Sequence, residues 1–328
     1  MPLTSATIGG ALRSAHDAGA LDLPLPGGGS TLQRWQSLAE LAAADLSLAR
    51  LAEGHADAVA ILAELAGSGS AAAAPGAIWG VWAAEPPGSQ VQAVRDTGGW
   101  RLTGRKSWCS GAGLIDRALI TALAEDGRRL FAVDVPDTIP VPGTWRAVGM
   151  AASGSLAVDL PGVRAAAVGG PGAYLARPGF WHGGAGVAAC WYGGALGAAR
   201  SLLGAARRRD VGPHALAHLG AVDAIVTGLA AQLQVAAAQI DGDPQDAGHA
   251  EARARRLRAR VEAGAAEVLD RVGRALGAGP LCLDPVHAQR AADLPVYLRQ
   301  SHAERDLADL GALAARDAAW DAAWDRTW

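Results

Sequence analysis

The chain has 328 residues, of which 50% are hydrophobic and 19% charged, so it can bury a large core in two or three domains. Its formal net charge of −3 gives no reason to expect a nucleic-acid partner. The three cysteines, Cys109, Cys190 and Cys282, form an odd, scattered set that excludes a disulfide framework. No basic and then apolar leader opens the chain, and we expect it in the cytoplasm.

Residues 1–75 predict a short helical region. From Thr31 to Ala66 the apolar residues recur at helical spacing, which predicts two helices before a Gly/Ser-rich segment. Glu53, His55 and Asp57 resemble metal ligands, but residues two apart lie on different faces of a helix. We therefore expect no metal site.

Residues 76–170 predict a β-domain. Short strands are expected over 78–82, 91–95, 100–103, 118–123, 130–135 and 156–160. Gly98-Gly99 and Asp126-Gly127 supply turns between them, and Gly104-Arg105-Lys106 predicts a further turn. We expect an antiparallel β-barrel or sandwich.

Residues 171–328 predict helices over 181–209, 213–240 and 249–276, with a fourth inside 285–313. Long helices with short connections predict an antiparallel four-helix bundle. The stretch between Arg177 and Arg200 carries no formal charge, but its many Gly and Ala residues are typical of a buried helix rather than a membrane span. The expected fold class is α+β multidomain, with a short N-terminal helical region, a middle β-domain and a C-terminal bundle.

The stretch from Gly98 to Asp116 carries the clearest chemical signal. Trp108 stands beside the hydroxyl of Ser110, and Gly111-Ala112-Gly113 leaves backbone N–H groups bare for a flat or anionic ligand. These residues are compatible with a binding site for an aromatic cofactor, and equally with an ordinary corner of a β-sheet.

The spacing of Gly98-Gly99-Trp100, Lys106, Trp108, Ser110 and Asp116 resembles the middle-domain motif of the acyl-CoA dehydrogenase superfamily. The order of helical region, β-domain and bundle also resembles that fold, over roughly residues 77–310. The resemblance implies a divergent member with a shortened N-terminal region. It also implies an FAD held against Trp108 and Ser110.

Further positions extend the resemblance to the cofactor. The loop Glu85–Gln90 resembles the family's flavin loop, although Ala84 replaces its Thr. Arg208 matches an arginine that meets the flavin phosphates of a neighbouring subunit, which implies a homodimer or homotetramer. The residues that the resemblance places at the cofactor are Trp108, Ser110, Ser89, Arg208, Arg274, Gly277 and Gly279.

The family's catalytic base has no firm counterpart. Its position on the first bundle helix falls near Val187, in a stretch without a carboxylate. The other position, near the end of the chain, offers Glu304 and His302. A carboxylate buried beside flavin would have the raised pKa that removal of an α proton needs. Glu304 also suits a surface ion pair with a nearby arginine.

The resemblance thus implies an FAD-dependent oxidoreductase that acts on the Cα–Cβ bond of an acyl thioester or related activated acid. Two alternatives stay open. A flavin-dependent monooxygenase of the same fold needs no carboxylate base, and a non-catalytic relative would keep the fold for assembly or binding. The sequence sets neither the small-molecule substrate nor the electron acceptor.

Overall fold

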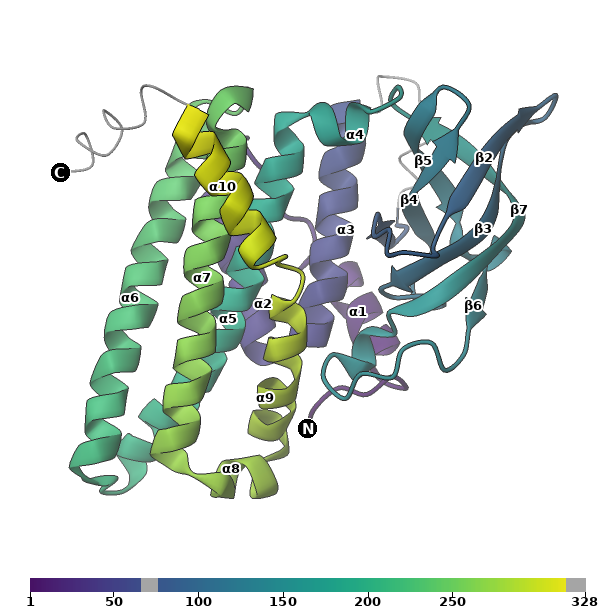
Figure 1. Cartoon of the computed structure of the whole chain (residues 1–328). Helices are drawn as coiled ribbons and strands as arrows, with labels where there is room; N and C mark the ends of the chain where they lie inside the picture. The colour runs from purple at the N-terminus through teal and green to yellow at the C-terminus, as the bar shows by residue number, and fades with distance from the viewer. Residues whose placement is uncertain (66–75, 317–328) are drawn as a thin grey trace.

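The computed structural model describes residues 1–65 and 76–316, and these run from helices through a small barrel to a bundle (Figure 1). The N-terminal helices are α1 (Ile8–Asp17), α2 (Thr31–Ala44) and α3 (Leu46–Leu65). Asp45 separates α2 from α3, and its Oδ1 accepts the N–H of Leu48 at 2.8 Å. The two helices expected after Thr31 are confirmed.

The middle strands close into a small barrel. They are β1 (Trp79–Trp82), β2 (Val91–Asp96), β3 (Gly99–Cys109), β4 (Arg117–Ala124), β5 (Gly127–Asp134), β6 (Ile139–Val141) and β7 (Leu156–Val168). Pairing runs β4-β2-β3-β7-β5 and returns from β5 to β4. The barrel is confirmed, but the expectation of a wholly antiparallel sheet is wrong. β4 runs parallel to β1 and β2, because the chain crosses a corner after β3 before it enters β4.

Glycines set the local turns of this barrel. Asp96 pairs with Gly99 across a two-residue turn, where Gly99 has a φ of 114°, and Gly127 (φ 120°) does the same between β4 and β5. Both predicted turns are confirmed. The turn predicted at Gly104 is wrong, because β3 continues to Cys109. A Cβ on Gly104 would lie 2.4 Å from the carbonyl oxygen of Gln90, so glycine serves a close backbone approach there.

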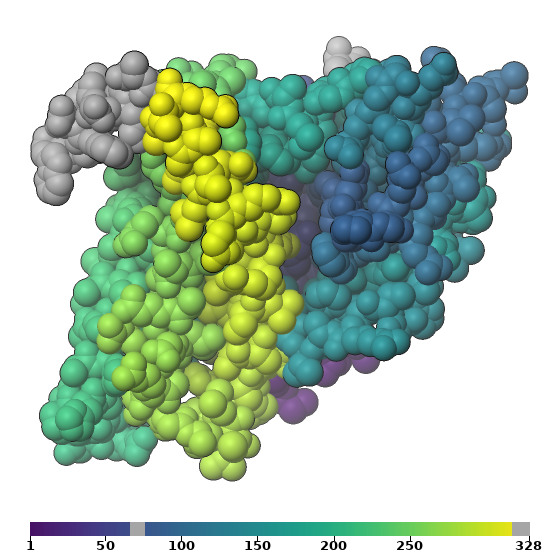
Figure 2. Space-filling model, viewed as in Figure 1, coloured from purple at the N-terminus to yellow at the C-terminus, as the bar shows by residue number. Residues whose placement is uncertain are grey.

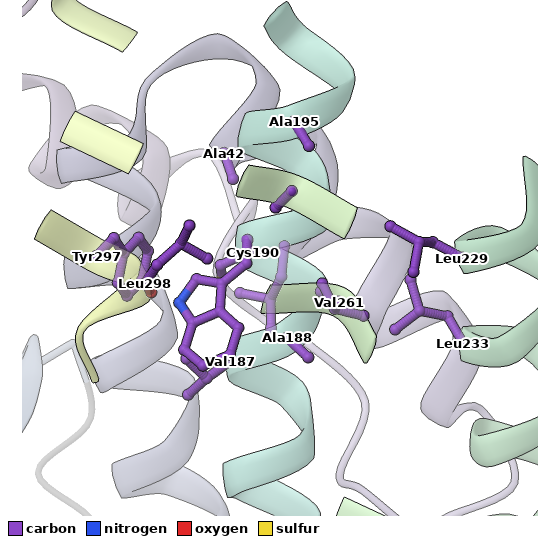
Figure 3. Packing of buried hydrophobic residues seen from close by; sticks show 14 of the residues in the cluster. Ala42, Val187, Ala188, Cys190, Ala195, Leu229, Leu233, Val261, Tyr297 and Leu298 are labelled. Atoms are coloured by element: carbon purple, nitrogen blue, oxygen red, sulfur yellow. The ribbon is translucent and has the colours of Figure 1, made fainter. Parts of the chain in front are cut away.

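The second half of the described chain is helical. Its elements are α4 (Ala173–Ala176), α5 (Pro178–Arg208), α6 (Gly212–Gly242), α7 (Ala247–Leu276), α8 (Ala278–Leu283), α9 (Pro285–Leu298) and α10 (Glu304–Arg316). The single helix expected inside 285–313 is two, since the chain breaks after Leu298 and Ala303 has a φ of 48°. Between the bundle helices lies an apolar core that includes Cys190, Val261 and Tyr297 (Figure 3).

α5 packs through glycines, as its composition predicted. A Cβ on Gly193 would lie 2.2 Å from the carbonyl oxygen of Ala39 in α2. One on Gly183 would lie 2.5 Å from Oδ1 of Asp57 in α3. The bare glycine face therefore lets α2 and α3 approach α5 closely.

α6 has an unusually apolar outer surface. Among the described helices it alone is long and apolar enough, by length and composition, to cross a membrane. Only 28% of its most apolar stretch is buried within the chain. Leu216 and Val235 are 53% and 58% exposed.

The barrel docks on α9 through the loop that contains Gly149 and Met150. A Cβ on Gly149 would lie 1.9 Å from the carbonyl oxygen of Ala292, so only glycine fits. The N–H of Met150 donates to Oδ1 of the buried Asp293, and Nε1 of Trp145 donates to the carbonyl oxygen of Met150 at 3.0 Å. These contacts fix the barrel against the bundle.

Candidate functional site

A hollow separates the barrel from the α10 end of the bundle. Figure 2 shows it between the yellow C-terminal helices and the blue-to-teal barrel, with purple atoms of the N-terminal helices at its floor. Figure 1 places α3 between the bundle and the barrel, and the loop from α9 to α10 on the bundle side. Residues from all three parts of the fold therefore surround the hollow.

The corner from Trp108 to Gly113 stands where β3 ends. Trp108 has a φ of 57°, a strained value for a bulky residue, and its side chain is 55% exposed. The pairing of β3 with β7 shifts between Lys106 and Cys109, and this bulge turns Trp108 outward. A strained and exposed tryptophan is the kind of backbone outlier that gathers at functional sites.

Three serine hydroxyl groups form a hydrogen-bonded row next to Trp108 in the corner. Oγ of Ser110 lies 2.9 Å from Oγ of Ser155, which lies 2.9 Å from Oγ of Ser153. The Ser110 carbonyl oxygen accepts Nε1–H of the buried Trp82 at 3.0 Å. The corner is thus rigid, and the Ser110 hydroxyl is either a donor or an acceptor there.

Two other motif positions serve the fold. Lys106 is 1% exposed, and its Nζ donates to Oγ1 and the carbonyl oxygen of Thr121 at 2.7 and 3.0 Å. Burial lowers the pKa of Lys106, and Glu85 at 3.5 Å opposes this effect. Asp116 accepts the N–H of Ile78 at 2.7 Å and pairs with Arg13.

The face of α3 toward α5 is charged. Nη1 of Arg50 contacts the buried carboxylate of Glu53, and Asp57 follows one turn later. Burial raises the pKa of the Glu53 and Asp57 carboxyls, against the lowering effect of nearby arginines. His55 lies on another face, as predicted, where its Nδ1 accepts the N–H of Trp79 at 3.1 Å. No group of three metal-binding side chains occurs among the residues that the structure describes.

A narrow crevice separates α3 from the corner. It holds about 10 Å³ of space, close to the volume that one water molecule needs. Arg50, Val81 and Ser110 keep some exposure, whereas the remaining lining residues are buried. The crevice is lined by Arg50, Leu51, Gly54, Trp79, Gly80, Val81, Ser110 and Ile115.

The structure does not bury the predicted base candidates. Glu304 is the exposed first residue of α10, and His302 is an exposed loop residue whose backbone N–H donates to Asp306. Arg299, the surface partner considered for Glu304, instead contacts Glu262. Exposure removes the burial that the proposed base role of Glu304 required.

Ser89 and Arg274 have local partners. Oγ of Ser89 donates to the carbonyl oxygen of Arg105 at 3.1 Å and accepts the N–H of Ser107 at 2.9 Å, so it ties its loop to β3. Arg274 is an exposed partner of Asp270 at 3.4 Å. Neither contact points to a cofactor.

An arginine-lined pocket of about 440 Å³ lies at the C-terminal end of α5. Arg208 lines it, as do Leu276 and Pro280, which flank the Gly277–Gly279 segment. The fold thus brings two predicted cofactor elements together. The sequence did not single out two further lining arginines, Arg200 and Arg290, because isolated charges on helices resemble ordinary solvated positions.

Comparison with known proteins gives a consistent fold. No family model and no curated protein matches the chain. Among solved structures, the chain is similar to the dibenzothiophene monooxygenase TdsC from Paenibacillus sp. A11-2, with a TM-score of 0.74, 18% identity, and 94% and 95% of the two chains covered. It is similar to a nitrososynthase from Micromonospora carbonacea var. africana, with a TM-score of 0.78, 20% identity, and 95% and 92% covered.

A third similar structure is the 3-HSA hydroxylase from Rhodococcus sp. RHA1, with a TM-score of 0.70, 17% identity, and 93% and 94% covered. TdsC has been crystallised with FMN, and so has KijD3, which matches with a TM-score of 0.73 at 20% identity. The chain therefore has the acyl-CoA dehydrogenase-like fold that these proteins share.

Proposed function

We propose that this protein is a flavin-dependent oxidoreductase of the monooxygenase type, which acts on a small molecule in the hollow between barrel and bundle. The observation that carries the proposal is the exposed and strained Trp108, in a corner whose Ser110 shares a crevice with Arg50 of α3. The aromatic face suits a flavin ring. The charged Arg50, paired with Glu53, does not suit an apolar acyl chain.

The alternative, oxidation of an acyl thioester, lacks support at two points. A dehydrogenase needs a buried base, whereas Glu304 is exposed and Val187 is apolar. That missing base is one of the two points, and the charged Arg50 beside the corner is the other. Reaction of reduced flavin with dioxygen needs neither a buried carboxylate base nor an apolar channel for an acyl chain.

The described residues fit a flavin. Trp108 offers a ring face, and the Ser110 hydroxyl offers one hydrogen bond at its edge. A bound flavin would supply two-electron transfer and reaction with dioxygen. The relatives crystallised with FMN make FMN as good a candidate as the FAD that the sequence resemblance implies.

A homo-oligomer is part of the proposal. Leu46 at the start of α3 lies against Gly194 of α5, and Arg208 lies 14 residues later, about 21 Å along the helix. Arg208 therefore lies beyond the end of α3 and suits the phosphate of a flavin on a neighbouring subunit. The exposed apolar side of α6 provides a surface for that contact.

The absorption spectrum and the released cofactor of the purified protein test the proposal first. A yellow protein that takes up FMN or FAD supports it, and a colourless protein that takes up neither refutes it. Arg208→Gln should weaken flavin binding and Arg207→Gln should not, since Arg208 lines the pocket and Arg207 does not. Oligomeric state by light scattering tests the subunit contact.

Two reduction experiments then separate the activities. A monooxygenase should consume dioxygen when a flavin reductase supplies electrons, and acyl-CoA compounds should leave its flavin oxidised under anaerobic conditions. Anaerobic bleaching by an acyl-CoA would instead support the dehydrogenase alternative. A protein that binds flavin but passes electrons to no acceptor would support the non-catalytic alternative.

A further inference from the structure

We infer that Arg50 anchors an anionic oxygen of the substrate at the floor of the hollow. The substrate class is then small molecules that carry a carboxylate or another anionic oxygen. The inference rests on the proposed function, because it takes the hollow as the substrate site. Three observations support it: the free donors of Arg50, the size of the crevice and the way that Arg50 is held.

Arg50 has hydrogen-bonding capacity that this chain does not use. A guanidinium carries five N–H donors. Nη1 contacts Glu53, and within residues 1–65 and 76–316 no other acceptor contacts the group. The side chain is 15% exposed and lines the crevice, and its unused donors are not sealed from solvent. An anionic acceptor that enters the crevice can therefore reach them.

The crevice beside Arg50 matches one oxygen atom in size. Its volume of about 10 Å³ is near the lower limit for a single water molecule. Gly54 and Gly80 contribute no side chains to its walls, and a Cβ on Gly80 would lie 2.5 Å from Cδ1 of Ile115. One carboxylate oxygen would therefore fill the crevice, and the rest of the molecule would stay outside it.

Glu53 fixes the orientation of the guanidinium. It precedes Gly54 on α3 and is buried, so the Arg50–Glu53 contact is shielded from water. Burial raises the pKa of Glu53, and the adjacent Arg50 opposes this effect. A buried ion pair contributes little net stability compared with apolar packing, so a purely structural role explains the pair poorly. The planar fork of arginine suits a carboxylate.

Titration calorimetry with benzoate and its neutral analogue benzamide tests the inference on the purified full chain, both as isolated and loaded with flavin. Benzoate should bind more tightly than benzamide. Arg50→Gln should weaken benzoate binding at least tenfold and leave benzamide binding unchanged. The matched control is Arg105→Gln, which removes an arginine that is also ion-paired, to Asp159, but lies outside the crevice. It should bind both compounds like the unchanged chain.

Equal benzoate affinity in Arg50→Gln and the unchanged chain would overturn the inference, as would no benzoate binding by the unchanged chain. If Arg50→Gln does not fold, Arg50→Lys decides. It keeps the charge but loses the fork, so benzoate should bind several-fold more weakly, and unchanged affinity would refute the anchor. Arg50-dependent benzoate binding by a chain that takes up no flavin would support the inference while the proposed function fails.

Discussion

Replacing Gly193 with alanine should destabilise the protein, whereas the same change at Gly184 of the same helix should stabilise it. A Cβ on Gly193 would lie 2.2 Å from the carbonyl oxygen of Ala39, more than 1 Å closer than an ordinary contact. A Cβ on Gly184 would meet nothing within 4 Å. Both changes gain about 1 kcal/mol of helix propensity, so the difference between them isolates the packing of α5 on α2.

The expected magnitudes have opposite signs. Overpacking typically costs about 1–3 kcal/mol, and here a backbone atom of α2 must move, so Gly193→Ala should lose at least about 1 kcal/mol net. Gly184→Ala should gain about 0.5–1 kcal/mol. For a chain of 328 residues each kcal/mol shifts the midpoint by roughly 1.5 °C.

Thermal unfolding and urea unfolding followed by circular dichroism measure both variants. The two melting temperatures should lie on opposite sides of that of the unchanged chain. If Gly193→Ala is as stable as Gly184→Ala, the close approach of α5 and α2 is refuted. In that case the glycines of α5 do not set the spacing between these helices.

Three further changes test the elements that frame the hollow. Burial lowers the pKa of His55 from 6.5 to about 4, so the unfolded chain binds its proton more readily between these values. Stability should therefore fall by about 3 kcal/mol as the pH drops from 6.5 to 4, and the pH dependence of urea unfolding should flatten in His55→Gln. Lys106→Met should cost about 2–4 kcal/mol in urea unfolding, because Thr121 loses a charged partner while buried. Gly149→Ala should lower the melting temperature by several degrees, because its Cβ would collide with the backbone of α9, and an unchanged value would refute that docking contact.

The sequence predicted those parts of the fold that local residues determine. The turns at Gly99 and Gly127 follow from positive φ, which glycine adopts freely, and both hairpins occur. The parallel pairing of β4 depends on where a distant corner sends the chain, which no local pattern carries. Likewise, Gly104 suggested a turn because glycine is common in turns, whereas here it makes room for the backbone at Gln90.

The candidate site likewise contains residues that the sequence predicted and residues that it did not. Trp108 and Ser110 were identified from their spacing, and the structure gives them an exposed, strained corner. Arg50 was missed, because a charge at helical spacing is usually solvated, and its place beside Gly80 and Ser110 depends on parts of the chain far along the sequence. Glu304 was singled out by position near the end of the bundle, but the break after α9 leaves it exposed.

Two features that do not favour stability occur on the two sides of the crevice, one in the corner and one on α3. A tryptophan at a φ of 57° is strained, and the buried Arg50–Glu53 pair lost its hydration when the chain folded. Asp57 also enters the protein interior, where glycine at position 183 leaves room for its carboxylate. The barrel can be joined to the bundle without buried charge, since the close contact of Gly149 with α9 already connects the two. Strain and buried charge that the fold does not need are expected where a protein binds or transforms a ligand, and their position supports an anionic substrate over an acyl chain.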